Sequence, residues 1–408
     1  MRVIIIGGGA SGVVAALKAK EKNNEVTILE NNDQLLKKIL LTGNGRCNYM
    51  NEDYNLSNYT SSDPSRIEQI INETNIWKAR SFFDVLGVIP KVKNGYYYPF
   101  TNQASTIRDL LVSAVEEKDI EVFYNTHVDE ITKKDDKFLI HTKDRDFYGD
   151  KVILATGSLA YPKTGCDGSG YKLLKEVGHT IVQPLPGLVQ LVSDFPLSKK
   201  WSGVRCDVKL ELMEDDECIA EEEGELQLTD YGLSGICIFN LSNLVSRGLF
   251  NKKKEIININ FVPFIESLII PWLERYSKKN QYKKVKKLLE GFLNKKVVPV
   301  ILEYAKIPSN MNYDELDSEE KLRLSKYLTS FPIEITDTKG FDNSQIAIGG
   351  VRLNEINLDT MESNLVKGLY ITGELLDING KCGGYNLTTC WISGIIAGEA
   401  IGDMYDQN

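Results

Sequence analysis

The chain begins with a short apolar strand that runs directly into a glycine-rich turn. Residues 2–6, RVIII, form an almost continuous β-branched run, which is typical of a buried parallel strand. Gly7, Gly9 and Gly12 follow with the spacing G-x-G-x-x-G, and a helical pattern begins inside this turn. A second apolar run then ends in the acid Glu30. Strand, turn, helix, strand and terminal acid together predict a dinucleotide-binding βαβ unit.

Each part of this unit has a physical role. Gly7 permits the tight turn, Gly9 lets the backbone approach a pyrophosphate, and Gly12 lets the helix pack closely on the strand. The helix N-terminus offers unpaired N–H groups to the phosphates, and Glu30 can accept hydrogen bonds from a ribose diol. The alternative is a glycine-rich turn in an α/β fold that binds no nucleotide.

A long loop, LLKKILLTGNGRCNYMN, follows the second strand where an NAD domain would usually continue as βαβ. Its glycines and asparagines tolerate unusual backbone angles. Gly43 and Gly45 would allow close approach to the flavin half of FAD, and Arg46 would supply charge. The loop therefore favours FAD over NAD. Cys47 is expected to be a free thiol beside the cofactor; a catalytic disulfide is the alternative, but the next cysteine is Cys166.

Two later segments have the pattern of strands that end at a ligand. The strand KVILATG ends at Ala155-Thr156-Gly157, and GLYITGE ends at Gly373-Glu374. A helix with small residues begins near Gly384, and its N-terminus would face the flavin. Val128, after another strand, is expected to meet the adenine, although an ordinary strand end is the alternative.

From residue 188 the pattern changes to alternating apolar and polar residues, which predicts antiparallel strands. A lysine-rich segment of helical period follows. We predict an α/β fold: a Rossmann-like FAD-binding domain with a parallel sheet, and an inserted β-rich domain that itself carries a helical subdomain. The expected ranges are 1–187 with 345–408 for the FAD-binding domain, 188–262 with 326–344 for the β-rich domain, and 263–325 for the helical insert.

Composition excludes several classes of protein. The net charge of −9 argues against a nucleic acid as the main partner. Seven cysteines without CxxC spacing indicate reduced thiols and a cytoplasmic location, and three histidines, none at i, i+4 from another, indicate no metal site. No apolar run is long enough to span a membrane. The oligomeric state is not predicted.

Five motifs together resemble one known family. They are GGGASG, KKILLTGNGRCN, ATGSLAYPKTGCDGSGY, TDYGLSG and the C-terminal segment from GGVRLNEIN to GGYN. The family is the bacterial BaiN-like family of FAD-dependent oxidoreductases, which includes the aminoacetone oxidases and belongs to the glutathione-reductase-like flavoprotein superfamily. The resemblance implies FAD contacts by Gly7, Gly9, Ala10, Ser11, Gly12, Glu30, Lys38, Thr42, Gly43, Asn44, Gly45, Arg46, Cys47, Asn48, Val128, Ala155, Thr156, Gly157, Gly373, Glu374, Asp377, Gly384, Tyr385, Asn386 and Leu387.

The expected function is transfer of a hydride between the flavin and a small organic substrate. Amine oxidation and conjugated-alkene reduction both stay open, and NAD(P)H would be a transient donor because no second dinucleotide fingerprint occurs. The candidates on the substrate side are Arg46, Tyr97, Tyr161 and Tyr385, and no general acid is named. The alternatives are a flavin-binding protein without turnover and an RNA-modifying or RNA-binding flavoprotein that uses the eight lysines of residues 278–296. Those lysines also fit a solvated helix face.

Overall fold

The computed structural model describes residues 1–402, apart from the side chains of residues 266–268. The chain divides into two compact units, Met1–Leu185 with Gln345–Asn408 and Pro186–Ser344. Residues 403–408, at the end of the predicted FAD-binding domain, lie outside the described residues. The three-part scheme stays a prediction, because the strands and helices of residues 186–344 fall within one unit.

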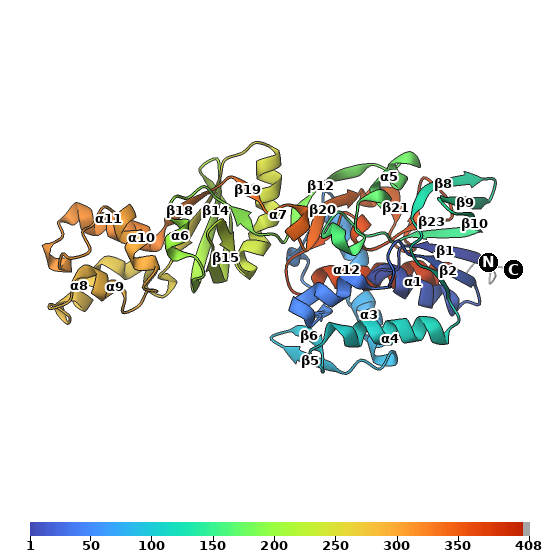
Figure 1. The fold of residues 1–408 in the computed structure, drawn as a ribbon, viewed down its shortest axis with the longest axis horizontal. Helices are drawn as coiled ribbons and strands as arrows, with labels where there is room; N and C mark the ends of the chain where they lie inside the picture. Colours follow the sequence, from blue (N-terminus) through green and yellow to red (C-terminus); the bar gives the residue numbers. More distant parts are fainter. Residues whose placement is uncertain (403–408) are drawn as a thin grey trace. The chain divides into compact units, whose positions relative to one another are not determined.

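A seven-stranded sheet forms the centre of the first unit (Figure 1). Its order is β21-β22-β23-β11-β1-β2-β7, and the five strands from β23 to β7 are parallel. This arrangement confirms the predicted Rossmann-like parallel sheet. The strands are β1 (Arg2–Ile6), β2 (Glu25–Leu29), β7 (Glu121–Phe123), β11 (Lys151–Leu154), β21 (Ile356–Asn357), β22 (Glu362–Ser363) and β23 (Leu369–Ile371).

Two helices from opposite ends of the described chain pack side by side (Figure 1): α1 (Ala10–Lys20), which lies against β1 and β2, and α12 (Tyr385–Ala400). A Cβ at Gly394 would lie 2.5 Å from the carbonyl oxygen of Ser11, so the two backbones approach closely there. Tyr385 precedes Gly394 by nine residues, whereas Ala10 precedes Ser11 by one. A second contact, 2.5 Å between a Cβ at Gly398 and the carbonyl oxygen of Ala15, shows that the two helices run in the same direction. Helix α12 therefore begins eight residues, or about 12 Å, ahead of α1.

Smaller elements surround the central sheet. Strands β10-β9-β8 and β3-β6-β5 form two three-stranded sheets, while β24 pairs with β4 and β12 with β20. The strands are β3 (Met50–Asn51), β4 (Tyr59–Thr60), β5 (Pro90–Lys93), β6 (Tyr96–Pro99), β8 (Val128–Lys134), β9 (Lys137–Thr142), β10 (Asp146–Gly149), β12 (Ile181–Gly187), β20 (Ile346–Val351) and β24 (Asn379–Gly380). The helices are α2 (Ile67–Ile70), α3 (Glu73–Val85), α4 (Ala104–Glu117) and α5 (Ser169–Glu176).

The second unit contains a seven-stranded sheet of order β18-β17-β14-β15-β16-β13-β19, whose paired strands are antiparallel. Aromatic packing of Trp201 and Phe331 lies in its core, with ring centroids 5.4 Å apart. The strands are β13 (Leu191–Val192), β14 (Arg205–Glu214), β15 (Glu217–Leu228), β16 (Gly232–Ser234), β17 (Glu255–Asn260), β18 (Phe331–Ile335) and β19 (Asp337–Thr338). The helices are α6 (Ser198–Trp201), α7 (Ile236–Phe250), α8 (Ile269–Lys278), α9 (Val285–Leu289), α10 (Val297–Tyr304) and α11 (Ser318–Thr329).

Short 3-10 helices complete both units. They are η1 (Lys37–Gly45), η2 (Leu56–Asn58), η3 (Pro64–Arg66), η4 (Pro162–Thr164), η5 (Pro263–Leu268), η6 (Tyr313–Glu315), η7 (Phe341–Asn343), η8 (Leu353–Glu355) and η9 (Gly373–Leu375). Within residues 1–402, no helix is both long enough and apolar enough to cross a bilayer.

Candidate functional site

The glycines of the first turn meet three different surroundings. A Cβ at Gly7, where φ is +103°, would lie 2.4 Å from the carbonyl oxygen of Ala155, and a Cβ at Gly12 would lie 2.0 Å from that of Gly7. A Cβ at Gly9 would meet no atom of the described structure within 4 Å. Two of the glycines therefore serve close packing of strand and helix, while Gly9 leaves the start of α1 open to a ligand.

Glu30, at the end of β2, is buried and holds the glycine turn in place. Its Oε2 accepts a hydrogen bond from the N–H of Gly8 at 2.7 Å. Its Oε1 accepts from the N–H and the side-chain amide of Asn32, both at 2.7 Å. Asn32 was not among the predicted residues; its position two residues after the strand-end acid was the only signal. The carboxylate thus has a structural role as well as the predicted one toward a ribose.

The loop after β2 bends sharply within η1. Thr42 is extended, while Gly43, Asn44 and Cys47 have positive φ angles of 55–56°. The N–H of Cys47 donates to the carbonyl oxygen of Thr42 at 3.0 Å, and the Cys47 side chain is buried. Burial raises the pKa of the Cys47 thiol to about 12, so the thiol stays protonated and unreactive at neutral pH.

Arg46 lies on the surface of this loop. Its guanidinium carbon is 5.4 Å from the centre of the Tyr98 ring, and its Nε donates to the carbonyl oxygen of Gly43 at 3.3 Å. Gly43, Asn44 and Gly45 are exposed beside it. Arg46 is thus free to meet a ligand, and its placement depends on an aromatic neighbour that the sequence analysis did not name.

The next residue of interest, Asn48, faces the start of α12. Its buried Oδ1 has no hydrogen-bond partner among the described residues, and a Cβ at Gly384 would lie 3.0 Å from it. Gly384, with φ of +91°, precedes α12, and no described side chain caps this helix. Asn386 is engaged instead with Gly380: its Oδ1 accepts from the Gly380 N–H at 2.8 Å, and its Nδ2 donates to the Gly380 carbonyl oxygen at 2.9 Å.

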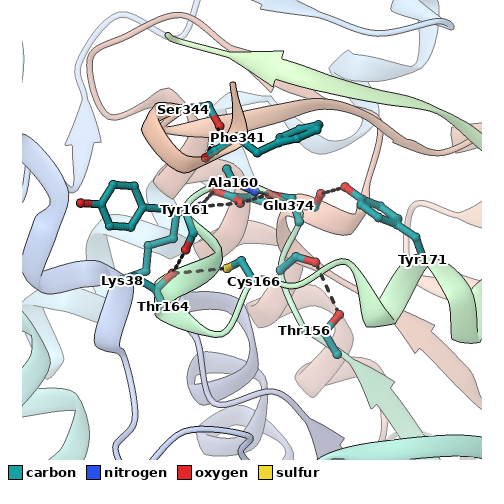
Figure 2. Close-up of polar contacts among 12 residues, drawn as sticks. Lys38, Thr156, Ala160, Tyr161, Thr164, Cys166, Tyr171, Phe341, Ser344 and Glu374 are labelled. Carbon is teal, nitrogen blue, oxygen red and sulfur yellow. Dashed lines mark hydrogen bonds and ion pairs between the residues drawn. The ribbon is translucent and has the colours of Figure 1, made fainter. Parts of the chain in front are cut away.

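A part-buried ion pair joins the loop to the end of β23 (Figure 2). Lys38 Nζ lies 2.8 Å from Glu374 Oε2, which also accepts a hydrogen bond from Ser158 Oγ at 2.7 Å. The Tyr171 hydroxyl donates to the carbonyl oxygen of Glu374 at 3.2 Å. Burial disfavours the ammonium, but the Glu374 carboxylate holds the pKa of Lys38 above its ordinary value. The pair is therefore charged on both sides and neutral in sum.

The parallel strands bring most of the predicted residues to one edge of the sheet. β1, β2, β11 and β23 are neighbours, so the positions that follow their carboxyl ends lie at the same edge. The edge therefore holds the turn with Ala10 and Ser11, then Glu30, then Ala155, Thr156 and Gly157, then Gly373 and Glu374. The start of α12, with Tyr385 and Leu387, lies instead next to Asn48 and Met50.

Two predicted cofactor residues stand apart from this edge. Val128 begins β8 in a separate sheet, although Thr126, two residues earlier, donates its N–H to the carbonyl oxygen of Glu30 at 2.9 Å. Asp377 is fully buried and accepts from the Ser62 N–H at 2.7 Å and from Asn379 Nδ2 at 3.1 Å. In this structure the carboxylate of Asp377 therefore anchors neighbouring segments.

The tyrosines predicted for the substrate side lie in different environments. Tyr97 on β6 packs inward, with its ring centre 6.1 Å from that of Tyr49 and 5.1 Å from the Arg80 guanidinium carbon. Tyr385 is buried, and burial with the nearby Asp53 raises its pKa to about 12. Neither arrangement suits a proton donor that reaches a substrate freely.

The third tyrosine predicted for the substrate side is Tyr161, and Tyr97 has two tyrosine neighbours on β6. Tyr161 is half-buried with φ of +58°, and its carbonyl oxygen accepts from the Thr164 hydroxyl at 2.8 Å (Figure 2). Tyr96 and Tyr98 point to the face of β6 opposite Tyr97, because adjacent residues of a strand alternate. Period-two alternation in the sequence indicates that Tyr97 faces away from its two neighbours, whereas the strand pairing decides which face of the sheet each ring occupies.

FAD fits these residues. Helices α1 and α12 both begin without a side-chain cap among the described residues, and their starts are offset by about 12 Å along a common direction. Such an offset suits an anionic pyrophosphate at one end and an electron-rich ring at the other. The open space at Gly9 and the unpartnered Asn48 Oδ1 lie at these two helix starts. The described residues contain no group of three His, Cys, Asp or Glu placed to hold a metal ion.

Comparisons with known proteins agree with this geometry. Residues 1–400 match the family model described as HI0933-like protein Rossmann domain. A 3-dehydro-bile acid delta(4,6)-reductase of Clostridium scindens is 38% identical over 378 residues, 92% of each chain. A ribosomal RNA dihydrouridine synthase of Escherichia coli is 26% identical over 371 residues, 90% of each chain.

A solved structure shares the fold. The 3-ketosteroid-delta4-(5alpha)-dehydrogenase from Rhodococcus jostii RHA1, in complex with 4-androstene-3,17-dione, superposes with a TM-score of 0.50 at 13% identity, over 98% of this chain and 96% of that one. At this identity the likeness concerns the fold alone. The predicted family and FAD cofactor are confirmed by the matches over almost the whole chain. The chain belongs to the HI0933-like family and is an FAD-dependent oxidoreductase.

Proposed function

We propose that this enzyme reduces a carbon–carbon double bond conjugated to a carbonyl group in a small organic substrate, with NAD(P)H as electron donor. The observation that carries the proposal is the 38% identity to a reductase whose name specifies a 3-dehydro-bile acid and its delta(4,6) unsaturation. In the net reaction, a hydride is added to the β-carbon and a proton to the α-carbon, and NAD(P)H is oxidised to NAD(P)⁺. Of the two reactions left open by the sequence, this proposal chooses alkene reduction.

The proposed cofactor site runs from α1 to α12. The open backbone at Gly9 and the first N–H groups of α1 would receive the pyrophosphate, and Glu30 would accept from the adenosine ribose. Asn48 Oδ1 and the start of α12 at Gly384 would face the flavin end. A bound FAD would supply the hydride-transfer chemistry between a reduced nicotinamide and the substrate. The uncapped N-terminus of α12 would stabilise negative charge at this end of the site.

The chain's residues would orient the cofactor and leave donor and substrate to enter from outside. The Lys38–Glu374 pair would add no net charge beside the cofactor, whereas the dipole of α12 and the charge of Arg46 would act on the flavin end. The buried thiols of Cys166 and Cys390 also lie near the pair, and burial raises the pKa of both. We therefore assign them no part in electron transfer.

Anaerobic flavin-reduction screening tests the proposal. NADH, NADPH and small primary amines would each be mixed with the FAD-loaded enzyme while flavin absorbance is followed. We expect bleaching by a reduced nicotinamide and reoxidation by a 3-dehydro-delta(4,6) bile acid, with a reduced steroid product. Bleaching by amines alone, followed by reoxidation with oxygen alone, would favour amine oxidation and contradict the proposal. A lack of bleaching by every donor would indicate flavin binding without turnover.

RNA modification is a second candidate, favoured by the 26% identity to a ribosomal RNA dihydrouridine synthase. Dihydrouridine differs from uridine by reduction of a double bond conjugated to a carbonyl group, so the chemistry is of the same type. The identity is lower than that to the bile acid reductase, and the lysines of residues 278–296 are its only other support. Dihydrouridine formation in ribosomal RNA by the reduced enzyme, without turnover of any free enone, would favour this candidate.

A further inference from the structure

One face of the small sheet β3-β6-β5 has no role in the site proposed above. In the register of this sheet, Lys91 lies opposite Tyr98, and Lys93 and Asn51 lie opposite Tyr96 on either side. Residues directly opposite each other on antiparallel strands point to the same face. We call these five residues, Asn51, Lys91, Lys93, Tyr96 and Tyr98, the tyrosine–lysine face.

This face borders the flavin end of the proposed cofactor site. A Cβ at Gly43 would lie 3.7 Å from Cε1 of Tyr98, and a Cβ at Gly383 would lie 2.6 Å from Cε1 of Tyr96. Gly43 belongs to the loop that carries Arg46, and Gly383 precedes the start of α12. The two tyrosine rings therefore pack against both turns that would approach the flavin.

The same face carries exposed positive charge. Lys91 and Lys93 are exposed, and the Arg46 guanidinium carbon lies 5.4 Å from the centre of the Tyr98 ring. None of these three cations forms an ion pair with any residue in the described part of the chain. Tyr98 thus has the Arg46 guanidinium near its ring and Lys91 as its cross-strand neighbour, in a protein whose net charge is −9.

Acidic groups lie toward the other end of the face. The N–H of Glu52 donates to the carbonyl oxygen of Gly95 at 2.8 Å, which places Glu52 beside the β5–β6 turn. Asp53 follows Glu52. Burial first, and then the nearby Asp53 and Tyr96, raise the pKa of Tyr385. The positive end of the face is therefore at Lys91, Tyr98 and Arg46.

We infer that the tyrosine–lysine face binds a planar organic ligand that carries an anionic carboxylate or phosphate group. The planar part would lie on the Tyr98 ring, and the anion would be held by Lys91 and Arg46, since aromatic rings and cations together favour flat anionic ligands. Two ligands of the proposed function have this chemistry: a substrate with a carboxylate side chain, and the phosphorylated end of the nicotinamide donor. The inference rests on the proposed function for these two sources.

Equilibrium binding to the oxidised, FAD-loaded enzyme tests this inference without any turnover. The probes, titrated by calorimetry, are a 3-dehydro-delta(4,6) bile acid, its methyl ester and NADP⁺. The test variant is Lys91→Gln combined with Lys93→Gln. The matched control is Lys134→Gln with Lys137→Gln. These two exposed lysines lie opposite each other in the β8–β9 hairpin, so the control removes the same charge from another pair of strands.

Two results would support the inference and distinguish the sources. A rise of roughly threefold to tenfold in the ratio of acid to ester dissociation constants would assign the anion to the substrate. A similar weakening of NADP⁺ alone would assign it to the donor. Either effect should disappear at 0.5 M salt, because screening removes interactions between exposed charges. Tyr98→Leu should weaken acid and ester alike, whereas Tyr98→Phe should not, with FAD content measured in both variants.

Three results would overturn it. They are unchanged affinity for the acid and for NADP⁺ in the Lys91/Lys93 variant, an equal loss in the control variant, or no binding of any probe to the unmodified enzyme. Salt-dependent RNA retention lost only in the Lys91/Lys93 variant would assign the face to a nucleic acid instead. A failure of turnover with normal probe binding would contradict the proposed function but leave this inference standing.

Discussion

Lys38 and Glu374 are 336 positions apart in the chain, yet their charged groups meet at 2.8 Å. The pair ties the loop after β2 to the end of β23, and Ser158 and Tyr171 hold Glu374 from the other side. The contact fixes the geometry of two segments that the proposed cofactor site needs at once. Its loss should therefore be visible in stability and in FAD binding.

Lys38→Met should lower the free energy of unfolding by about 1–3 kcal/mol, because Glu374 would keep a part-buried charge without its partner. Lys37→Met is a close control, since Lys37 makes a long contact of 3.9 Å with the exposed Asp33 and one hydrogen bond of 3.2 Å to the neutral Asn32 Oδ1, so its loss leaves no buried charge behind. That change should stay within about 0.5 kcal/mol. Urea unfolding of the FAD-free protein measures both values, and equal effects of the two changes would refute the importance of the pair.

Gly9→Ala and Gly12→Ala should separate ligand approach from packing. At Gly12 the methyl group would lie 2.0 Å from a backbone oxygen. The free energy of unfolding of the FAD-free protein should therefore fall by about 2–4 kcal/mol, and its melting temperature should fall with it. At Gly9 the methyl group meets no atom of the described structure within 4 Å. Gly9→Ala should therefore melt like the unmodified protein but bind FAD at least roughly tenfold more weakly, since it blocks the pyrophosphate. Unchanged FAD affinity in Gly9→Ala would contradict the proposed approach.

Glu255 should make the second unit more stable in acid. Its side chain is buried, and burial together with the neighbouring Glu214 raises its pKa to about 7. The folded protein therefore keeps the proton between pH 4.5 and 7 while the unfolded chain loses it, so this contribution is complete below pH 4.5 and is lost as pH rises to 7.

Glu255→Gln checks this prediction, because glutamine resembles the protonated acid and does not titrate. The variant should lose the decline between pH 4.5 and 7 and gain roughly 1–3 kcal/mol at pH 8 relative to the unmodified protein. Calorimetric melting of the second unit at several pH values gives the measurement. A parallel pH dependence in both proteins would show that Glu255 is not the group responsible.

Cysteine labelling should follow burial. Cys218 is exposed, whereas Cys47, Cys166 and Cys390 are buried and burial raises the pKa of each thiol. Iodoacetamide at pH 8 should therefore modify Cys218 within minutes and leave those three unmodified until urea is added. Mass spectrometry of tryptic peptides reads the pattern. A disulfide at Cys47 in the oxidised, active enzyme would restore the redox role that the structure gives no reason to assign.

The first βαβ unit could be predicted because its determinants are local. A β-branched run, a glycine spacing and a helical period are read within thirty residues, and β1, α1 and β2 begin and end close to those signals. The family motifs extended this prediction to the ends of β11 and β23. The residue contacts with FAD stay predictions, because they concern a ligand and not the fold.

What could not be predicted depends on pairing between distant segments. The ion pair of Lys38 and Glu374 needs β23 beside β11, and Asp377 turns toward Ser62 only because β24 pairs with β4. The choice of Tyr97 for the substrate side was a local guess among three tyrosines. The pairing of β6 with β5 decides which face of the sheet each ring occupies, and no short stretch of sequence contains that pairing.

Strands β12 and β20 pair with each other just where the chain leaves the first unit and returns to it. The carbonyl oxygen of Gln183 would lie 2.7 Å from a Cβ at Gly349, so the two connecting segments touch. A short hairpin turn could therefore join them in place of residues 188–344, with little loop to close. The second unit is therefore an insertion that could be replaced by another domain, in evolution or by design, without changing the path of the chain in the first unit.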